Sequence, residues 1–359
     1  MTASTVWALA DQISSQCGRH DQLPLHAEND DAEATTHIPS RFILPPHLRP
    51  CPPPALASDA APAVPVIDLA RPNGDDLLLA QLHSACSQWG LFHVVNHGVP
   101  NAVLCRLQSQ IEAFLALPVT ERSPRLQGNL GEGYGTGFIR RSTGIMEWRD
   151  CLRLSTFPPS HRNYDAWPNN PHFREALEDF SDATRNFQMQ MLRYISQSLG
   201  LAATKLEEIV GEMQQTILMN HYPPCPQPSM VAGVDSHSDI GAITCQWQYD
   251  DVIGLHALHD GKWLPVHPPP GALTIIVGDQ VQIASNGIYK SAMHRGVVSS
   301  TKHRVSMVSF YQLKAEQVVS PAQELVDNQH EQLYPPTRFS DHEFAKKGSL
   351  SFSSNGHMQ

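Results

Sequence analysis

The second half of the chain constrains the fold most, because short β-rich runs alternate there with turns. The runs are Thr216–Tyr222, Ile243–Trp247, Gly254–His259, Trp263–Val266, Leu273–Val277, Val281–Ala284, Tyr289–His294 and Arg304–Gln312. The segments between them contain Gly, Pro and Asp, which favour turns. Closely spaced short strands of this kind are typical of a β-sandwich or a double-sheet jelly roll. We therefore predict a jelly-roll core from Thr216 onward.

The first half of the chain has a helical pattern instead. Helices are predicted at Leu77–Trp89, Asn101–Leu117, 171–200 and Ala203–Val210. Short strands are predicted at 64–69 and Leu91–Val95. The expected fold class is α+β with a mainly β core: a double-stranded β-helix, or jelly roll, with a helical N-terminal region packed against it.

Changes in composition and periodicity along the 359-residue chain predict four parts. Residues 1–62 contain a short helix around Val6–Ala10 and a Pro-rich arm, and residues 63–200 form the helical N-terminal region. Residues 201–330 form the jelly-roll core, and residues 331–359 form a C-terminal tail. The Gly-rich segment 128–144 is interpreted as a turn region, since it lacks a phosphate-binding pattern.

The overall composition excludes several classes of partner. A net charge of −10 disfavours nucleic acid, because phosphate binding needs a basic face. The seven cysteines are scattered and form no CxxC pair, which favours reduced thiols over a disulfide framework. No signal-like N-terminal segment or run of transmembrane length is visible. We therefore expect a cytoplasmic protein with no membrane or nucleic-acid partner. A monomer with a small-molecule partner is also expected.

Three residues in the predicted core have the spacing of a metal site. His237 and Asp239 are two residues apart at a strand end, and His294 follows several strands later. A jelly roll brings distant strands side by side, so the three are compatible with one site. Two imidazoles and one carboxylate form the facial triad that holds non-haem Fe(II) and leaves coordination positions open. A catalytic zinc hydrolase remains an alternative on these ligands alone, although no thiolate accompanies them.

A cationic residue follows the triad inside an apolar run. Arg304 and Ser306 are two residues apart on a predicted strand, so their side chains point to the same face. A buried guanidinium without a partner is costly, so Arg304 needs an anion. A bound dicarboxylic acid would supply one, through charge-assisted hydrogen bonds. The alternative is an ordinary internal salt bridge to an Asp or Glu.

A series of further motifs accompanies the triad and Arg304–Ser306. These motifs are Trp89–Val99, Phe114–Pro118, Gly133–Gly135, Asn220–Pro226, Gly278–Gln280 and Ser285–Gly287. With this combination the chain resembles, almost from end to end, the plant-type 2-oxoglutarate- and Fe(II)-dependent dioxygenases. The combination is highly specific, whereas each motif alone is weak.

The resemblance implies a set of site residues and cofactors. His237, Asp239 and His294 would ligate Fe(II) and so form the catalytic centre. The cosubstrate 2-oxoglutarate would be bound by a second group of residues, Arg304, Ser306, Tyr222 and Asn220. Molecular oxygen is the other substrate, and ascorbate is the expected activator. Oxidative decarboxylation would then release succinate and CO2 while the main substrate is hydroxylated or desaturated.

The main substrate is expected to be a small specialised metabolite, of phenolic or flavonoid-like aromatic character. The alternatives are a hormone or alkaloid oxidase of the same family, including O-demethylation, or a non-catalytic relative that binds a small molecule. By resemblance, the substrate pocket should include Tyr134, Cys151, Arg153, Leu218, Phe310 and Gln312. Arg153 would receive a phenolate or carboxylate if it faces the cavity, and otherwise lies at the solvated rim. Trp247 either narrows the pocket or fills core space.

Overall fold

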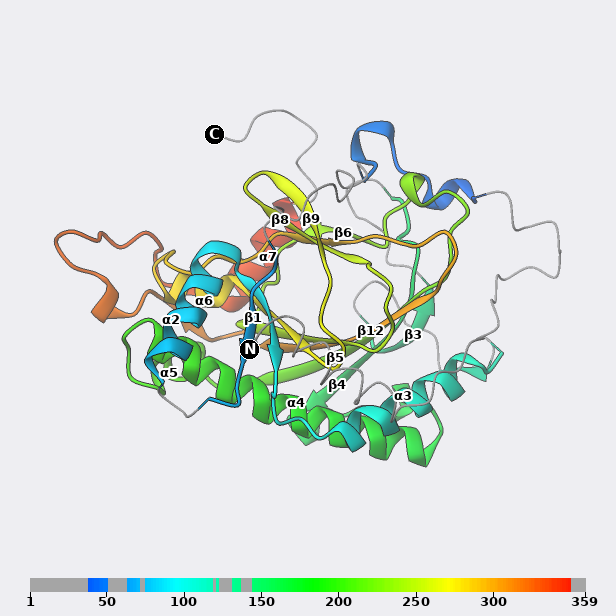
Figure 1. Cartoon of the computed structure of the whole chain (residues 1–359), viewed down its shortest axis with the longest axis horizontal. Helices are drawn as coiled ribbons and strands as arrows, with labels where there is room; N and C mark the ends of the chain where they lie inside the picture. The colour runs from blue at the N-terminus through cyan, green and yellow to red at the C-terminus, as the bar shows by residue number, and fades with distance from the viewer. Residues whose placement is uncertain are drawn as a thin grey trace.

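Two β-sheets face each other at the centre of the molecule, and helices cover the outer face of the larger one (Figure 1). The computed structural model describes residues 38–50, 63–71, 75–118, 121–122, 131–136 and 144–349. The predicted helix around Val6–Ala10 lies outside these ranges. Both sheets belong to the jelly-roll core, which confirms the predicted fold class.

The strand order of the two sheets is β1-β2-β10-β7-β12-β5-β4-β3 and β6-β11-β8-β9. All neighbouring pairs are antiparallel except the parallel pair of β1 and β2. The larger sheet contains β1 (Val66–Asp68), β2 (Leu91–Val95), β3 (Gly133–Thr136), β4 (Asp150–Phe157), β5 (Gln214–Tyr222), β7 (Ile243–Gln248), β10 (Leu273–Val277) and β12 (Arg304–Gln312). The smaller sheet contains β6 (Val234–His237), β8 (Leu255–His259), β9 (Lys262–Val266) and β11 (His294–Gly296), and β13 (Val318–Val319) pairs with β14 (Thr337–Arg338).

The longest helix, α4, lies across the outer face of the larger sheet, with α3 beside it (Figure 1). Asn170 caps its N-terminus by accepting hydrogen bonds from the backbone N–H groups of His172 and Phe173, and Pro171 occupies the first turn. The α-helices are α2 (Asp76–Ser84), α3 (Asn101–Leu115), α4 (Pro171–Ser198), α5 (Lys205–Val210), α6 (Asp279–Ala284) and α7 (Phe339–Ser349). Short helical turns are η1 (Ser40–Phe42), η2 (Pro46–Leu48), η3 (Ala85–Trp89), η5 (Pro159–His161), η6 (Tyr164–Ala166), η7 (Pro228–Met230) and η8 (Gln323–Leu325).

Residue alternation gives the larger sheet two chemically different faces. On β12, Val305, Met307 and Tyr311 belong to the apolar core beneath α4. The alternate residues Arg304, Val308 and Phe310 line a cavity on the opposite, inner face. Because successive side chains of a strand point to opposite faces, one strand both anchors the core and supplies a site.

A buried polar network fixes α4 on the outer face. The Gln188 amide of α4 donates to the backbone carbonyls of Ser309 on β12 (2.9 Å) and Ile243 on β7 (3.3 Å). The Ser309 hydroxyl donates back to Gln188 (2.8 Å) and accepts from Gln215 on β5 (2.8 Å). Buried polar groups that are satisfied in this way favour a single register. The helix and three central strands of the sheet are therefore locked together behind the cavity.

The structure corrects several expectations about local structure. Val281–Ala284, predicted as a strand, lies in helix α6, because a short apolar run does not distinguish strand from helix. The predicted strand Tyr289–His294 begins only at His294. The Gly-rich segment interpreted as a turn contains strand β3. Cys86, Cys151, Cys225 and Cys245 are buried thiols as expected, but Cys105 is disulfide-bonded, so the expectation of reduced cysteines does not hold there.

Candidate active site

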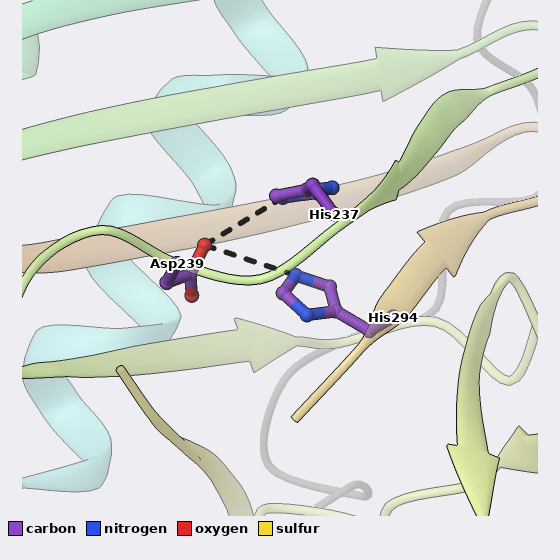
Figure 2. Close-up of side chains that lie close together, drawn as sticks. All are labelled: His237, Asp239 and His294. Carbon is purple, nitrogen blue, oxygen red and sulfur yellow. Dashed lines mark ion pairs between the residues drawn. The ribbon is translucent and has the colours of Figure 1, made fainter. Parts of the chain in front are cut away.

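The three predicted ligand residues lie close together where β6 ends and β11 begins, in the smaller sheet. His237 ends β6, its paired partner His294 begins β11, and Asp239 follows β6 directly. Asp239 Oδ1 lies 3.6 Å from His237 Nε2 and 3.8 Å from His294 Nε2. Figure 2 shows the carboxylate reaching both imidazoles. One ligand atom from each residue lies within 4.8 Å of the others, so all three can share one ion.

The backbone orients both imidazoles toward this point. His237 Nδ1 lies 2.8 Å from the carbonyl oxygen of Asp235, and His294 Nδ1 lies 3.0 Å from that of Ala292. A carbonyl only accepts, so each Nδ1 carries the proton and donates it. Each Nε2 then keeps its lone pair, which is the arrangement a metal-binding histidine needs.

The charges at the triad suit a divalent cation. Burial raises the pKa of the Asp239 carboxyl, but the neighbouring His294 and His237 more than offset this, and the pKa lies below its ordinary value. Burial, together with the proximity of His237, lowers the pKa of His294 to about 4, so this imidazole is neutral at pH 7. Asp239 Oδ2 is buried without a hydrogen-bond partner. An anionic oxygen in that position calls for a cation, and the donor set fits Fe(II) with positions left open.

A cavity of about 260 Å³ begins at the triad and extends over the inner face of the larger sheet. His237, Asp239 and His294 line it, and so do Arg304 and Tyr222. Since both the metal ligands and the cationic residue face one cavity, a small ligand can reach both. The arrangement therefore has a place for a chelating acid between the metal and Arg304.

Arg304 is buried, and no carboxylate of the described residues is in ion-pair contact with it. Its side chain is 3% exposed, and no Asp or Glu in the described part of the chain forms an ion pair with it. Nε donates to the side-chain oxygen of Gln248 (2.8 Å), while Nη1 is buried without a hydrogen-bond partner. The guanidinium lies over the Tyr222 ring, 4.5 Å from its centroid. The alternative of an internal salt bridge is therefore not what the structure shows, and the unpaired donor fits a ligand carboxylate.

The remaining predicted cosubstrate residues lie beside Arg304 on the same face. Ser306 and Asn220 are cross-strand partners in β12 and β5, and the Asn220 amide lies 3.5 Å from the Ser306 hydroxyl. Asn220 and Tyr222 line the cavity, whereas Ser306 is buried next to it.

Arg149 is a charged cavity residue that the sequence did not predict. Its guanidinium donates to the side-chain oxygen of Asn220 and forms a 2.7 Å ion pair with Glu147. Glu147 in turn accepts a hydrogen bond from the backbone N–H of Asp235, in the strand that carries His237. This chain of contacts braces the cavity wall against the metal-binding strand. Arg149 directly precedes β4, and the direction of its side chain is visible only in three dimensions.

The predicted substrate residues are divided between the two faces of the sheet. Leu218, Phe310 and Gln312 line the cavity. Cys151 and Arg153 are cross-strand partners of Asn220 and Leu218, so they share the inner face without being among the residues that line the cavity. Burial raises the pKa of Cys151 to about 12, so it remains a thiol.

Tyr134 and Trp247 lie on the other face. Tyr134 pairs with Leu152, packs edge-on against Phe114 and is not among the cavity-lining residues. Trp247 contacts Phe180 of α4, with ring centroids 5.9 Å apart, so it fills core space and does not narrow the pocket. Alternation along β3 and β7 accounts for both placements.

A jelly roll with a two-histidine, one-carboxylate site and an unpaired arginine in the same cavity defines the class of non-haem iron oxygenases that use an oxo-acid. Comparison with known proteins agrees. Residues 213–313 match the model of the 2OG-Fe(II) oxygenase superfamily, and residues 64–170 match that of the non-haem dioxygenase in morphine synthesis N-terminal region.

Several relatives are similar over most of their length. Jasmonate-induced oxygenase 2 of Arabidopsis thaliana is 34% identical over 92% of both chains, and codeine O-demethylase of Papaver somniferum is 35% identical over 77% of this chain and 79% of its own. The crystal structure of JOX2 in complex with 2OG, Fe and JA superposes with a TM-score of 0.79 and 32% identity, covering 91% of this chain and 96% of that one. The chain belongs to the 2OG-Fe(II) oxygenase superfamily and is an Fe(II)- and 2-oxoglutarate-dependent dioxygenase. None of the helices described has the length and apolarity needed to span a membrane.

Proposed function

We propose that this dioxygenase oxidises a small aromatic specialised metabolite, phenolic or flavonoid-like, by hydroxylation or desaturation, and releases succinate and CO2. The observation that carries the proposal is the shared cavity, which has the triad and the unpaired Arg304 on its walls. We also predict that the protein is a cytoplasmic monomer and that its chain is divided into the four parts given above.

Each group of residues has a distinct role in this proposal. His237, Asp239 and His294 would hold the iron, which when bound supplies the oxygen chemistry that is coupled to decarboxylation of 2-oxoglutarate. Arg304 would bind the distal carboxylate of the cosubstrate, with hydrogen bonds from Ser306 and Tyr222. The walls of the cavity would limit the access of water to the reacting groups.

The walls of the cavity away from the metal favour an aromatic substrate. Leu218, Val308 and Phe310 lie in one cluster on the inner face, together with the buried Cys151. Apolar and aromatic side chains of this kind stack on a planar ring and disfavour a charged sugar or phosphate. Among the relatives, flavanone 3-dioxygenase 2 of Oryza sativa subsp. japonica is 35% identical, which supports a flavonoid-like substrate.

A second candidate is oxidation of a hormone or an alkaloid, including O-demethylation. It is favoured by the similarity to codeine O-demethylase and to JOX2, whose structure contains JA.

The test is turnover of a metabolite panel with Fe(II), 2-oxoglutarate, ascorbate and O2, with products identified by mass spectrometry. We expect succinate in step with a product that gains one oxygen or loses two hydrogens; loss of a methylene unit would identify demethylation instead. Asp239→Ala is the matched control and should form no succinate above background. Equal succinate from both proteins, or turnover that needs zinc and no oxygen, would refute the proposal.

A further inference from the structure

The buried arginine of the cavity has a neutral amide as its hydrogen-bond partner, although the half-buried acid Asp250 lies close by. Arg304 Nε donates to Gln248 Oε1 at 2.8 Å. The Asp250 carboxylate is near enough for the Arg304 charge to oppose the rise that burial causes in its pKa, yet the two side chains form no ion pair. Gln248 lies between them, with hydrogen bonds to both.

The orientation of the Gln248 amide is fixed from the other side. Its Nε2 donates to the Asp250 side chain (2.8 Å), to the Asp250 carbonyl (3.1 Å) and to the Val252 carbonyl (2.7 Å). All three partners accept, so the NH2 group must face the loop and the oxygen must face Arg304. If the Gln248 amide were flipped, its NH2 group would face the N–H of Arg304 Nε, and two donors would meet.

Two further contacts confine the guanidinium. The Tyr222 ring lies against one side of it. Gly254 also lies against the Arg304 side chain and leaves room that a side chain would remove, because a Cβ there would lie 2.5 Å from Arg304 Cδ and 2.7 Å from Nε. Because the Gln248 side-chain oxygen also accepts a hydrogen bond from Arg304 Nε, the Arg304 side chain has one defined position. Its Nη1 remains without a protein partner.

We propose that Gln248 is a positioning residue that separates Arg304 from Asp250, so that the guanidinium is oriented but not neutralised before the cosubstrate binds. A direct Arg304–Asp250 salt bridge would satisfy the arginine internally and compete with the ligand carboxylate. A neutral acceptor satisfies Nε and leaves the positive charge for the ligand. The inference rests on the proposed function, in which Arg304 binds 2-oxoglutarate.

The first test replaces Gln248 with glutamate, an acid of the same shape. Gln248→Glu should weaken 2-oxoglutarate binding by about tenfold or more, the scale of one charge-assisted contact. The Kd is measured by calorimetry on the Mn(II)-loaded protein, and KM and kcat on the Fe(II) enzyme. We expect KM to rise with the Kd while kcat at saturating 2-oxoglutarate changes by less than about threefold. Gln323→Glu, the same change on an exposed residue, is the control and should bind as the wild type does.

The second test asks whether a second substitution restores the affinity for 2-oxoglutarate. Gln248→Ala should also weaken binding, because Arg304 is then free to pair with Asp250, and adding Asp250→Asn should restore much of the affinity. A purely structural defect would not be repaired by a second substitution. Absence of rescue, or a Gln248→Glu variant that binds like Gln323→Glu, would overturn the inference.

Arg304→Ala separates this inference from the proposed function. If Arg304→Ala leaves the affinity for 2-oxoglutarate unchanged, the assignment of the cosubstrate site fails. If it weakens binding but the Gln248 variants do not, only the role of Gln248 fails.

Discussion

Asp250 links the cosubstrate end of the cavity to pH. Burial raises its pKa to about 6, against the lowering effect of the Val305 N–H and of Arg304. The folded protein therefore binds a proton more tightly here than the unfolded chain does. It follows that the stabilising contribution of this group is complete below about pH 4 and is lost as pH rises through about 6.

We predict that wild type loses stability relative to Asp250→Asn between pH 4 and 6. The difference should reach roughly 1–3 kcal/mol, since one pKa unit corresponds to about 1.4 kcal/mol. The measurement is denaturant unfolding of the metal-free proteins at several pH values. An exposed aspartate away from this site serves as control, and Asp165→Asn should follow the wild type at every pH. Parallel curves for wild type and Asp250→Asn would contradict the prediction.

At the scale of single residues, the sequence predicted the groups that perform chemistry better than those that position them. His237, Asp239 and His294 have a spacing that few other functions require. Arg149 and Gln248 act through contacts with Asn220 and Arg304, which are 71 and 56 positions away in the chain. No local pattern records such pairs, so only the folded structure could show them.

At the scale of elements, periodicity predicted the long helices and the central strands and failed where it was weak. β5 and β12 have long apolar runs, and both were found. β6 has the polar sequence Val-Asp-Ser-His and was not predicted as a strand, because its residues serve the metal site rather than the core. The predicted C-terminal tail contains α7, whose polar sequence has no strong helical period.

Helix α7 is fastened to the turn that carries the metal ligands. Lys346 donates to the Ser238 carbonyl (2.9 Å) and hydroxyl (2.6 Å), between His237 and Asp239. Lys346 and His342 also contact the carboxylate of Asp279, whose backbone N–H donates to the Asp239 carbonyl. These contacts hold the ligand-bearing turn from behind, as outer contacts of metal sites do.

We therefore expect Lys346→Met to loosen the metal site while the fold persists. Affinity for Fe(II) or Mn(II) should fall by about 10–100-fold, the range seen when outer contacts of metal sites are removed. Anaerobic metal titration measures the affinity, and circular dichroism checks the fold. Lys262→Met, on the exposed edge of β9, is the matched control. Wild-type metal affinity in Lys346→Met would show that α7 has no part in holding the site.

At the scale of the whole molecule, the site exists only when both sheets are assembled. The metal ligands come from β6, β11 and the turn after β6, whereas Arg304 and Tyr222 come from β12 and β5 of the other sheet. These segments are far apart in the chain, so an unfolded chain cannot hold them together. Metal and cosubstrate should therefore bind the folded protein alone and stabilise it by mass action.

This coupling gives a prediction for thermal unfolding. At 100 times the Kd, each ligand should add about 2.7 kcal/mol to the stability, which corresponds to an increase of several degrees in Tm. Mn(II) should raise Tm in wild type and in Arg304→Ala, but not in Asp239→Ala. With Mn(II) present, 2-oxoglutarate should raise Tm further in wild type and much less in Arg304→Ala. A cosubstrate shift of equal size in Arg304→Ala would mean that the acid binds elsewhere, because a ligand stabilises a fold only through contacts that it makes there.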